Sequence, residues 1–260
     1  MVSRYNKNQD IFIFLESKVN EYNSENFIES DPVRIPHLFE RKEDIEISGF
    51  LTATISWGQR KNIIKSAEFL MQLMDYEPYE FILNADEKDL EHISRFYYRT
   101  FNATDIMFFV RSLQNIYKNK GGLENILVNE YRKTGCLMTG IMALRDEFFK
   151  PFHQKRSEKH FSNIRKGASG KRLNMFLRWM VRKDDRGVDF GIWNNISASD
   201  LYIPLDVHSG QTARKLGILT RKQNDWKAVV ELTEELRKFD PEDPVKYDYA
   251  LFALGVFEKF

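Results

Sequence analysis

A lysine directly behind a glycine-rich turn is the first feature of this sequence that could do chemistry. Gly167 and Gly170 permit a tight turn with unusual backbone angles, and the apolar pattern from about Lys171 predicts an amphipathic helix. The N–H groups of such a turn, together with a helix N-terminus, favour a phosphate group. A cation is disfavoured in a first helical turn, and a neutral lysine amine is a nucleophile toward carbon. Lys171 is therefore a candidate nucleophile, with a surface lysine that touches phosphate as the alternative.

Asp206 is the second candidate. It follows the apolar segment 201–205 and precedes a short predicted helix that Gly217 ends. The simplest interpretation is a helix N-cap whose carboxylate accepts from the N–H of Ser209 or a neighbour. A capping carboxylate can also face a cleft, so a catalytic role stays open. His208 is a candidate base or ligand, although no partner at metal-ligand spacing accompanies it.

The charge is unevenly distributed along the chain. The whole chain has 39 Lys and Arg against 38 Asp and Glu, a net charge of +1. Residues 155–183 hold ten cations and a single acid, Glu158, so this segment carries +9 and the rest of the chain −8. The asymmetry predicts a localised anion-binding face, with a solvated helix face as the alternative. Lys166, Arg172 and Arg178 would give this face a sequence-independent attraction to DNA.

Composition excludes several classes of protein. The chain has 260 residues, of which 42% are hydrophobic and 30% charged, as expected for a globular protein with a substantial core. Its one cysteine, Cys136, excludes an internal disulfide framework, a cysteine-ligated zinc site and a cysteine-held iron–sulfur cluster. We expect no metal site. The absence of a signal-peptide pattern and of a run of about 18 apolar residues predicts a soluble, cytoplasmic protein without a membrane partner.

Helical periodicity dominates the remaining sequence. Apolar residues recur at helical spacing over 47–55, 64–70, 104–113 and 137–148, and Asn84 followed by Glu87 predicts a capped helix start. No segment alternates in the manner of a strand, so we expect a nearly all-α chain of about ten helices with short loops. We predict a central helical bundle over 45–183 that ends in the basic hairpin, and a second helical lobe formed by 1–44 and 184–260.

The two candidate motifs together resemble the helix-hairpin-helix (HhH-GPD) superfamily of DNA glycosylases, especially the 8-oxoguanine glycosylases. Gly167-Ala168-Ser169-Gly170-Lys171 occupies the hairpin-plus-lysine position, and Leu205-Asp206-Val207-His208 with Arg214-Lys215-Leu216-Gly217 occupies the aspartate position. The segments 51–60 and 248–255 are similar to two further elements of these enzymes. The second hairpin glycine stands one place later than in the usual Gly-x-Gly-x-Lys. The whole chain is also similar to an uncharacterised bacterial family of unknown function within this superfamily.

The resemblance implies an all-α, two-lobed helix-hairpin-helix DNA glycosylase-like fold with its active cleft between the lobes. It implies base-excision repair of double-stranded DNA that carries a damaged base, with an oxidised purine as the expected lesion. The protein would act as a monomer. Lys171 would attack the sugar and form a Schiff base that permits strand cleavage, and Asp206 would stabilise the positive charge on the sugar.

The resemblance also assigns the residues around this pair. The expected DNA contacts are Lys166, Gly167, Gly170, Arg172, Arg178 and His208. The expected lesion pocket comprises Ser56, Trp57, Gln59 and Asp248, with Trp57 and Trp193 as candidates to stack on the extruded base. No cofactor is implied, except a monovalent cation that the hairpin carbonyls of such enzymes can hold. The alternative function is a non-catalytic helix-hairpin-helix module that binds DNA or RNA.

Overall fold

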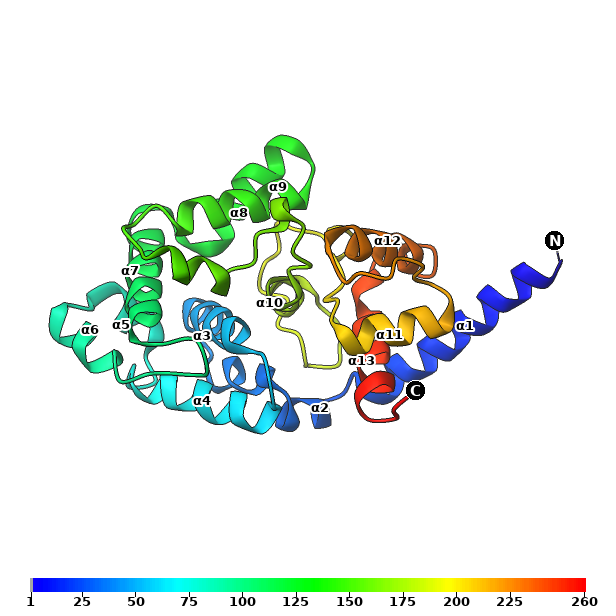
Figure 1. The fold of residues 1–260 in the computed structure, drawn as a ribbon, viewed down its shortest axis with the longest axis horizontal. Helices are drawn as coiled ribbons and strands as arrows, with labels where there is room; N and C mark the ends of the chain where they lie inside the picture. The colour runs from blue at the N-terminus through cyan, green and yellow to red at the C-terminus, as the bar shows by residue number, and fades with distance from the viewer. Residues whose placement is uncertain (1) are drawn as a thin grey trace. The chain divides into compact units, whose positions relative to one another are not determined.

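The described residues fold into helices that loops connect. A computed structural model describes its backbone from Val2 to Phe260 and its side chains from Asn8 onwards (Figure 1). Within these residues the only β-pairing consists of two isolated bridges, Tyr98–Phe101 and Ala168–Asp225, which confirms the all-α prediction. No helix in the same range combines the length and apolar character needed to cross a membrane.

The described residues form thirteen α-helices, more than the ten expected, and six short 3-10 helices. The α-helices are α1 (Val2–Tyr22), α2 (Glu25–Ser30), α3 (Lys42–Ile55), α4 (Arg60–Gln72), α5 (Pro78–Asn84), α6 (Glu87–Ile93), α7 (Ala103–Asn119), α8 (Gly122–Thr134), α9 (Leu137–Phe148), α10 (Lys171–Val181), α11 (Val207–Leu216), α12 (Trp226–Arg237) and α13 (Tyr247–Val256). The 3-10 helices are η1 (Pro32–Arg34), η2 (Pro36–Leu38), η3 (Lys155–His160), η4 (Ile164–Lys166), η5 (Ala198–Asp200) and η6 (Pro244–Lys246).

The chain is divided into two compact units. The terminal unit comprises residues 1–29 and 166–260, and the central unit comprises residues 30–165. The predicted division had the same discontinuous pattern, with boundaries at 44/45 and 183/184 instead. The observed boundary at 165/166 assigns α10 to the terminal unit. Contacts of α10 explain this, because its Phe176 packs against Trp193 and its Arg178 pairs with Asp248.

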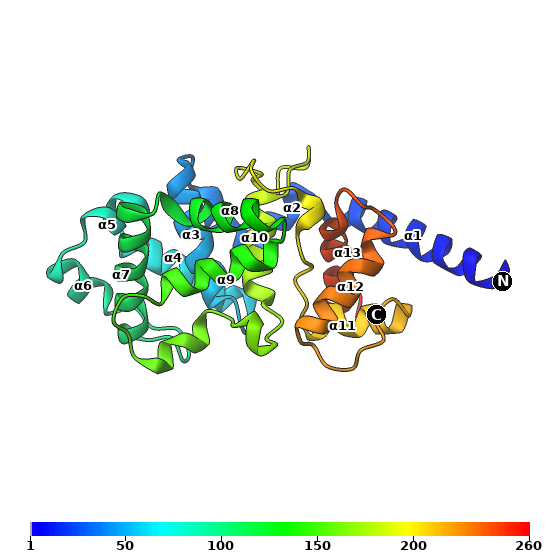
Figure 2. The same ribbon diagram turned by 90° about the horizontal axis from the view of Figure 1, so that it is seen from above.

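Aromatic side chains fill the core of the central unit. Phe109 packs against Phe148 with ring centres 4.7 Å apart, and Phe148 packs against Phe50 and Phe161. The helices α8 and α9 lie side by side (Figure 2). They approach closely at Gly140, where a Cβ atom would lie only 2.5 Å from a carbonyl oxygen of α8. The glycine therefore sets the spacing of this helix pair.

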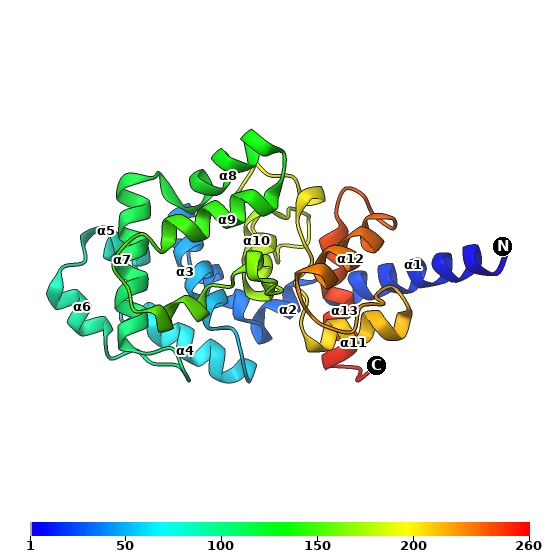
Figure 3. The same ribbon diagram turned by 45° about the horizontal axis from the view of Figure 1, so that its top comes forward.

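In the terminal unit, α13 is the central helix and packs against both α1 and α11 (Figure 3). Gly255 allows the close approach of α11, because a Cβ atom at that position would lie 3.1 Å from the carbonyl oxygen of His208. The buried side chains of α13 include Tyr247, Tyr249 and Leu251. This packing holds the first turn of α11 against α13, next to Asp206.

One predicted helix start is wrong. Asn84 is the last residue of α5, and its side chain donates to the carbonyl of Glu80 at 3.0 Å. The next helix is capped by Asp86, whose carboxylate accepts from the N–H groups of Lys88 and Asp89. Because a carboxylate two residues further on satisfies the new helix, Asn84 is left to close the preceding one.

Candidate active site

The glycine hairpin has the geometry that its sequence predicts. Gly167 and Gly170 both adopt positive φ, at 84° and 65°, which favours glycine, and α10 begins at Lys171. No heavy atom lies within 4 Å of a Cβ position built at Gly167, so the hairpin is open there. Lys166, just before it, is exposed. The apolar residues that make the predicted helix amphipathic are all buried, namely Leu173, Phe176, Leu177 and Met180.

Asp206 caps α11 as the simplest interpretation predicted. Its Oδ1 accepts from the backbone N–H groups of His208 at 2.8 Å and Ser209 at 3.0 Å. The hydroxyl of Ser209 accepts in return from the N–H of Asp206 at 3.0 Å, which completes a reciprocal capping box. Gly217 ends the helix with φ of 79°, also as predicted.

The same carboxylate also faces Lys171. The Nζ of Lys171 lies 3.5 Å from Oδ2 of Asp206, and their side chains are 27% and 22% exposed. One carboxylate oxygen of Asp206 therefore caps α11, while the other forms the ion pair with the Lys171 amine. The structure thus brings the two residues of the predicted catalytic pair together, in an ion pair that solvent can reach.

Asp248 belongs to the same group of charges. It lies in the first turn of α13, is 7% exposed, and accepts a hydrogen bond from Nη1 of Arg178. Burial raises the pKa of the Asp248 carboxyl to about 6; Arg178 and Lys171 oppose the rise and Asp206 adds to it. A carboxyl with a strongly shifted pKa beside a candidate nucleophile is typical of functional sites.

Arg178 does not have the DNA-contact position that was predicted for it. Its side chain is buried, with Nε 3.2 Å from Oδ1 of Asp189 and Nη1 on Asp248. The guanidinium carbon lies 4.3 Å from the ring centre of Tyr249. Arg178 faces the interior of the unit because two buried carboxylates hold it there. It therefore contributes to the site by pairing with Asp248 and not by contacting DNA.

The basic segment 155–183 does not form the uniformly positive surface that its composition predicted. At least five of its ten cations pair with acids, including Arg156 with Asp105, Arg165 with Asp146, and Arg182 with Asp184, Asp189 and Asp243. Arg172 is partly buried, and burial lowers the pKa of its guanidinium to about 10. The acidic excess elsewhere in the chain therefore neutralises much of this segment.

The remaining predicted residues are divided between the two units. His208 is exposed in the first turn of α11, in the terminal unit. Ser56, Trp57 and Gln59 belong to the central unit. Ser56 is buried and donates to the carbonyl of Thr52 at 2.7 Å, whereas Gln59 is exposed at the start of α4.

The two candidate tryptophans differ. Trp57 is partly exposed, and its ring stacks on His160 with centres 5.8 Å apart and planes 28° apart. Trp193 is fully buried edge-on against Phe176, so its predicted role in stacking on a base is wrong. Its large apolar ring serves the core behind α10 instead.

Sequence reasoning missed a buried acid behind Trp57. Asp105 accepts from the hydroxyl of Ser157 at 2.6 Å and from Arg156 at 2.7 Å, and lies 3.3 Å from Nε2 of His160. Burial alone would raise the pKa of the Asp105 carboxyl, but interactions led by His160 and Ser157 hold it well below the usual range. Asp105 also closes the capping box of α7 with Asn102, and this spacing was the available sequence signal.

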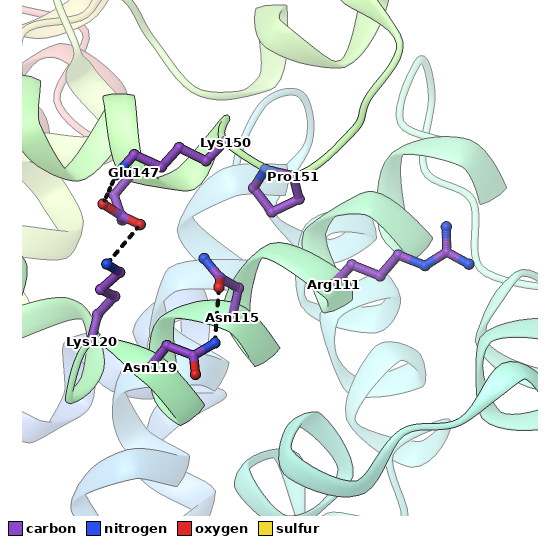
Figure 4. A pocket seen from close by; sticks show the side chains of 7 residues that line it. All are labelled: Arg111, Asn115, Asn119, Lys120, Glu147, Lys150 and Pro151. Carbon is purple, nitrogen blue, oxygen red and sulfur yellow. Dashed lines mark hydrogen bonds and ion pairs between the residues drawn. The ribbon is translucent and has the colours of Figure 1, made fainter.

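A separate hollow of about 640 Å³ lies in the central unit between α7 and the end of α9 (Figure 4). Glu147 points between Lys120 and Lys150, at 3.7 Å and 2.6 Å, and Asn119 donates to Asn115. Several residues around the hollow therefore pair with one another, while Arg111 pairs with Glu87 outside it. Among the described residues, no group of three or more His, Cys, Asp or Glu could hold a metal ion.

A known protein family matches nearly the whole length of this chain. The family described as "Protein of unknown function (DUF2400)" matches residues 31–257. The chain belongs to the DUF2400 family. The DUF2400 match contains the hairpin, Lys171, Asp206 and Asp248, and leaves out α1, α2 and the last three residues. No curated protein and no solved structure matches the chain. Membership of an uncharacterised family agrees with the sequence analysis, while the relationship of DUF2400 to the glycosylases stays a prediction.

Proposed function

We propose that this DUF2400 protein is a DNA glycosylase with lyase activity and a two-lobed helix-hairpin-helix glycosylase-like fold. The observation that carries the proposal is the pairing of Lys171 with Asp206 directly behind an open, positive-φ glycine hairpin. A lysine nucleophile needs a neighbouring group that accepts its proton, and a positively charged sugar needs a carboxylate. Asp206 can do both through the oxygen that is not used to cap α11.

The proposed reaction begins with proton transfer from Lys171 to Asp206. The neutral Nζ attacks C1′ of the damaged nucleotide, the bond from C1′ to the base breaks, and the base leaves with the bonding electrons and a proton. Opening of the sugar gives a Schiff base between C1′ and Nζ. Removal of a proton from C2′ then expels the 3′ phosphate and nicks the strand.

The proposed substrate is double-stranded DNA with an oxidised purine, bound by a monomer. The hairpin, which is open at Gly167, would hold a backbone phosphate through N–H groups and the N-terminus of α10, with Lys166 beside it. Gly170 is buried, so its predicted DNA contact is not part of the proposal. Within the central unit, the partly exposed ring of Trp57, which stacks on His160, is a separate candidate surface for stacking on a base. The proposed location is the cytoplasm.

Borohydride trapping tests the proposal. Wild-type protein is incubated with duplexes that each carry one oxidised, deaminated or alkylated base or an abasic site, and borohydride reduces any Schiff base to a stable adduct. We expect an adduct with at least one duplex, and none with Lys171→Gln, which retains a polar side chain but no nucleophile. Lys238→Gln, at an exposed lysine at the end of α12, is the matched control and should still form the adduct. Duplex binding by Lys171→Gln should be largely intact.

A non-catalytic DNA-binding module is the second candidate, favoured by one observation. The Lys171–Asp206 contact is an ordinary partly exposed ion pair, and the open hairpin alone would suffice to bind phosphate. Such a module would bind duplex DNA in a salt-dependent manner. It would give no adduct with any duplex, and this outcome separates the two functions.

A further inference from the structure

The loop that leads into α12, residues 221–226, is bonded to both halves of the candidate site. Asn224 donates from Nδ2 to the backbone carbonyl of Asp206 at 2.8 Å. Two residues later, the N–H of Trp226 donates to the carbonyl of Gly167 in the hairpin at 3.0 Å. One short loop thus connects the backbone that precedes Lys171 with the backbone of Asp206.

The Asn224 side chain is itself held in place. Its Oδ1 accepts from Nη2 of Arg214 at 2.6 Å, and Nε of Arg214 donates to the carbonyl of Arg221 in the same loop at 2.8 Å. The amide therefore has a fixed orientation, with its N–H toward Asp206 and its oxygen toward Arg214. Neither residue is needed to cap α11, since Asp206 and Ser209 do this by themselves.

Gly210 provides the space for this amide. A Cβ atom at Gly210 would lie 2.7 Å from Oδ1 and 3.1 Å from Nδ2 of Asn224. Glycine is a poorer residue than alanine inside a helix, and Gly210 stands within α11. Close contact with Asn224 accounts for a glycine at this position.

We propose that Asn224 is a positioning residue that fixes Asp206 relative to Lys171. The carbonyl of Asp206 accepts from the N–H of Gly210, as the first bond of the helix, and also from Asn224. These two bonds define the peptide plane that follows Asp206. The N–H groups of His208 and Ser209 hold Oδ1 on that backbone, which sets the direction in which Oδ2 meets Lys171. The tether from Trp226 to Gly167 holds the hairpin in the same frame. The inference rests on the proposed function for its catalytic consequence, although the positioning itself is a property of the fold.

Two variants test the role from opposite directions. Asn224→Asp keeps the size and the acceptor for Arg214, but presents an oxygen in place of an N–H to the Asp206 carbonyl. Gly210→Ala leaves Asn224 unchanged and improves the helix propensity of α11, but fills the space that the amide occupies. Gln223→Ala, an exposed neighbour in the same loop, is the matched control.

The first measurement needs no catalysis. Amide hydrogen exchange is followed at His208 and Ser209, whose N–H groups bind Oδ1 of Asp206. We expect exchange about five- to tenfold faster in Asn224→Asp and Gly210→Ala, the change that loss of one hydrogen bond produces, and no change in Gln223→Ala. Wild-type exchange rates in both test variants would overturn the proposal.

The second measurement uses single-turnover borohydride trapping on a duplex that wild-type protein attacks. We expect the rate constant at saturating protein to fall about tenfold or more in both variants, with the half-saturating protein concentration within about twofold of wild type. If Asn224 merely stabilised the loop, its substitution would lower the thermal midpoint without lowering the rate constant at saturating protein. Faster amide exchange with an unchanged rate constant would overturn the positioning role. If wild-type protein gives no adduct, the proposed function fails, and amide exchange alone decides whether Asn224 positions Asp206.

Discussion

Asp206 and Lys171 meet through a single carboxylate oxygen, while the other oxygen of Asp206 caps α11. The Oδ2–Nζ distance is 3.5 Å, and Oδ1 accepts two backbone N–H groups at 2.8 Å and 3.0 Å. The capping and catalytic interpretations of Asp206 are therefore compatible. This division of labour makes the two roles experimentally separable.

Asp206→Asn and Asp206→Ala should give different results. Asparagine caps a helix about as well as aspartate, so the thermal midpoint of Asp206→Asn should barely change, whereas Asp206→Ala should lose about 1 kcal/mol of unfolding free energy. Base release by Asp206→Asn should slow by about a hundredfold or more, because the charge opposite the sugar is lost. Thermal melts and single-turnover kinetics measure the two effects. Full activity in Asp206→Asn would reduce Asp206 to a helix cap.

Asp248→Asn should change how stability depends on pH. The pKa of Asp248 is about 6 in the folded protein and its ordinary value is 3.8, so the folded state holds a proton that the unfolded state has released between these values. Its contribution to the unfolding free energy is therefore full below about pH 4 and is lost as the pH rises through about 6. The thermal midpoint of Asp248→Asn relative to wild type should rise from pH 4 to pH 7.

Asp146→Asn is the matched control for this pH series. Arg165 forms a charge-assisted hydrogen bond with Asp146 and lowers its pKa, so Asp146 contributes stability at neutral pH that is lost only as the pH falls below about 4. The difference in thermal midpoint between Asp146→Asn and wild type should stay constant from pH 5 to pH 7. A flat profile for Asp248→Asn as well would contradict the burial of an ionisable Asp248.

Arg178→Met should be destabilising without altering electrostatic attraction to DNA. Removal of the guanidinium leaves the buried Asp189 and Asp248 carboxylates without this partner, which typically costs about 3–5 kcal/mol. The double variant Arg178→Met/Asp248→Asn should recover part of this loss. Chemical unfolding of both variants measures the effect. Wild-type stability in Arg178→Met would show that the buried charge network contributes nothing.

Lys166→Glu should weaken duplex binding about equally for all sequences. The slope of the logarithm of the binding constant against the logarithm of the salt concentration should also become shallower by about one, the value for one lost phosphate contact. Lys238→Glu is the control, because it changes an exposed lysine at the far end of α12, about 18 Å along the helix from the N-terminus that contacts the hairpin. An unchanged salt slope in Lys166→Glu would move the DNA-binding surface away from the hairpin.

Features with local causes were predictable from the sequence. The hairpin glycines, the start of α10 at Lys171 and the cap of α11 at Asp206 all follow from groups within a few residues of one another. The same local logic failed at Asn84, because Asp86 competes for the same helix start. Helical periodicity was sufficient for the all-α class, since it depends only on neighbouring residues.

Features with distant causes were not predictable. Arg178 looks like a surface cation in the sequence, and only the fold brings Asp189 and Asp248 to it. Trp193 looks equally suited to a pocket or a core, and its contact with Phe176 decides for the core. Asn224 belongs to no motif, since its role depends on a carbonyl and a guanidinium that come from α11 and its start.

Identification of the residue that carries the adduct tests the central claim most directly. Wild-type protein trapped on a lesion-bearing duplex is digested with nuclease and trypsin, and the peptides are analysed by mass spectrometry. We expect the sugar remnant on Lys171, with tryptic cleavage lost after that residue and retained after Lys166. A remnant on any other amine, or no adduct with any duplex, would contradict the assignment of Lys171 as the nucleophile.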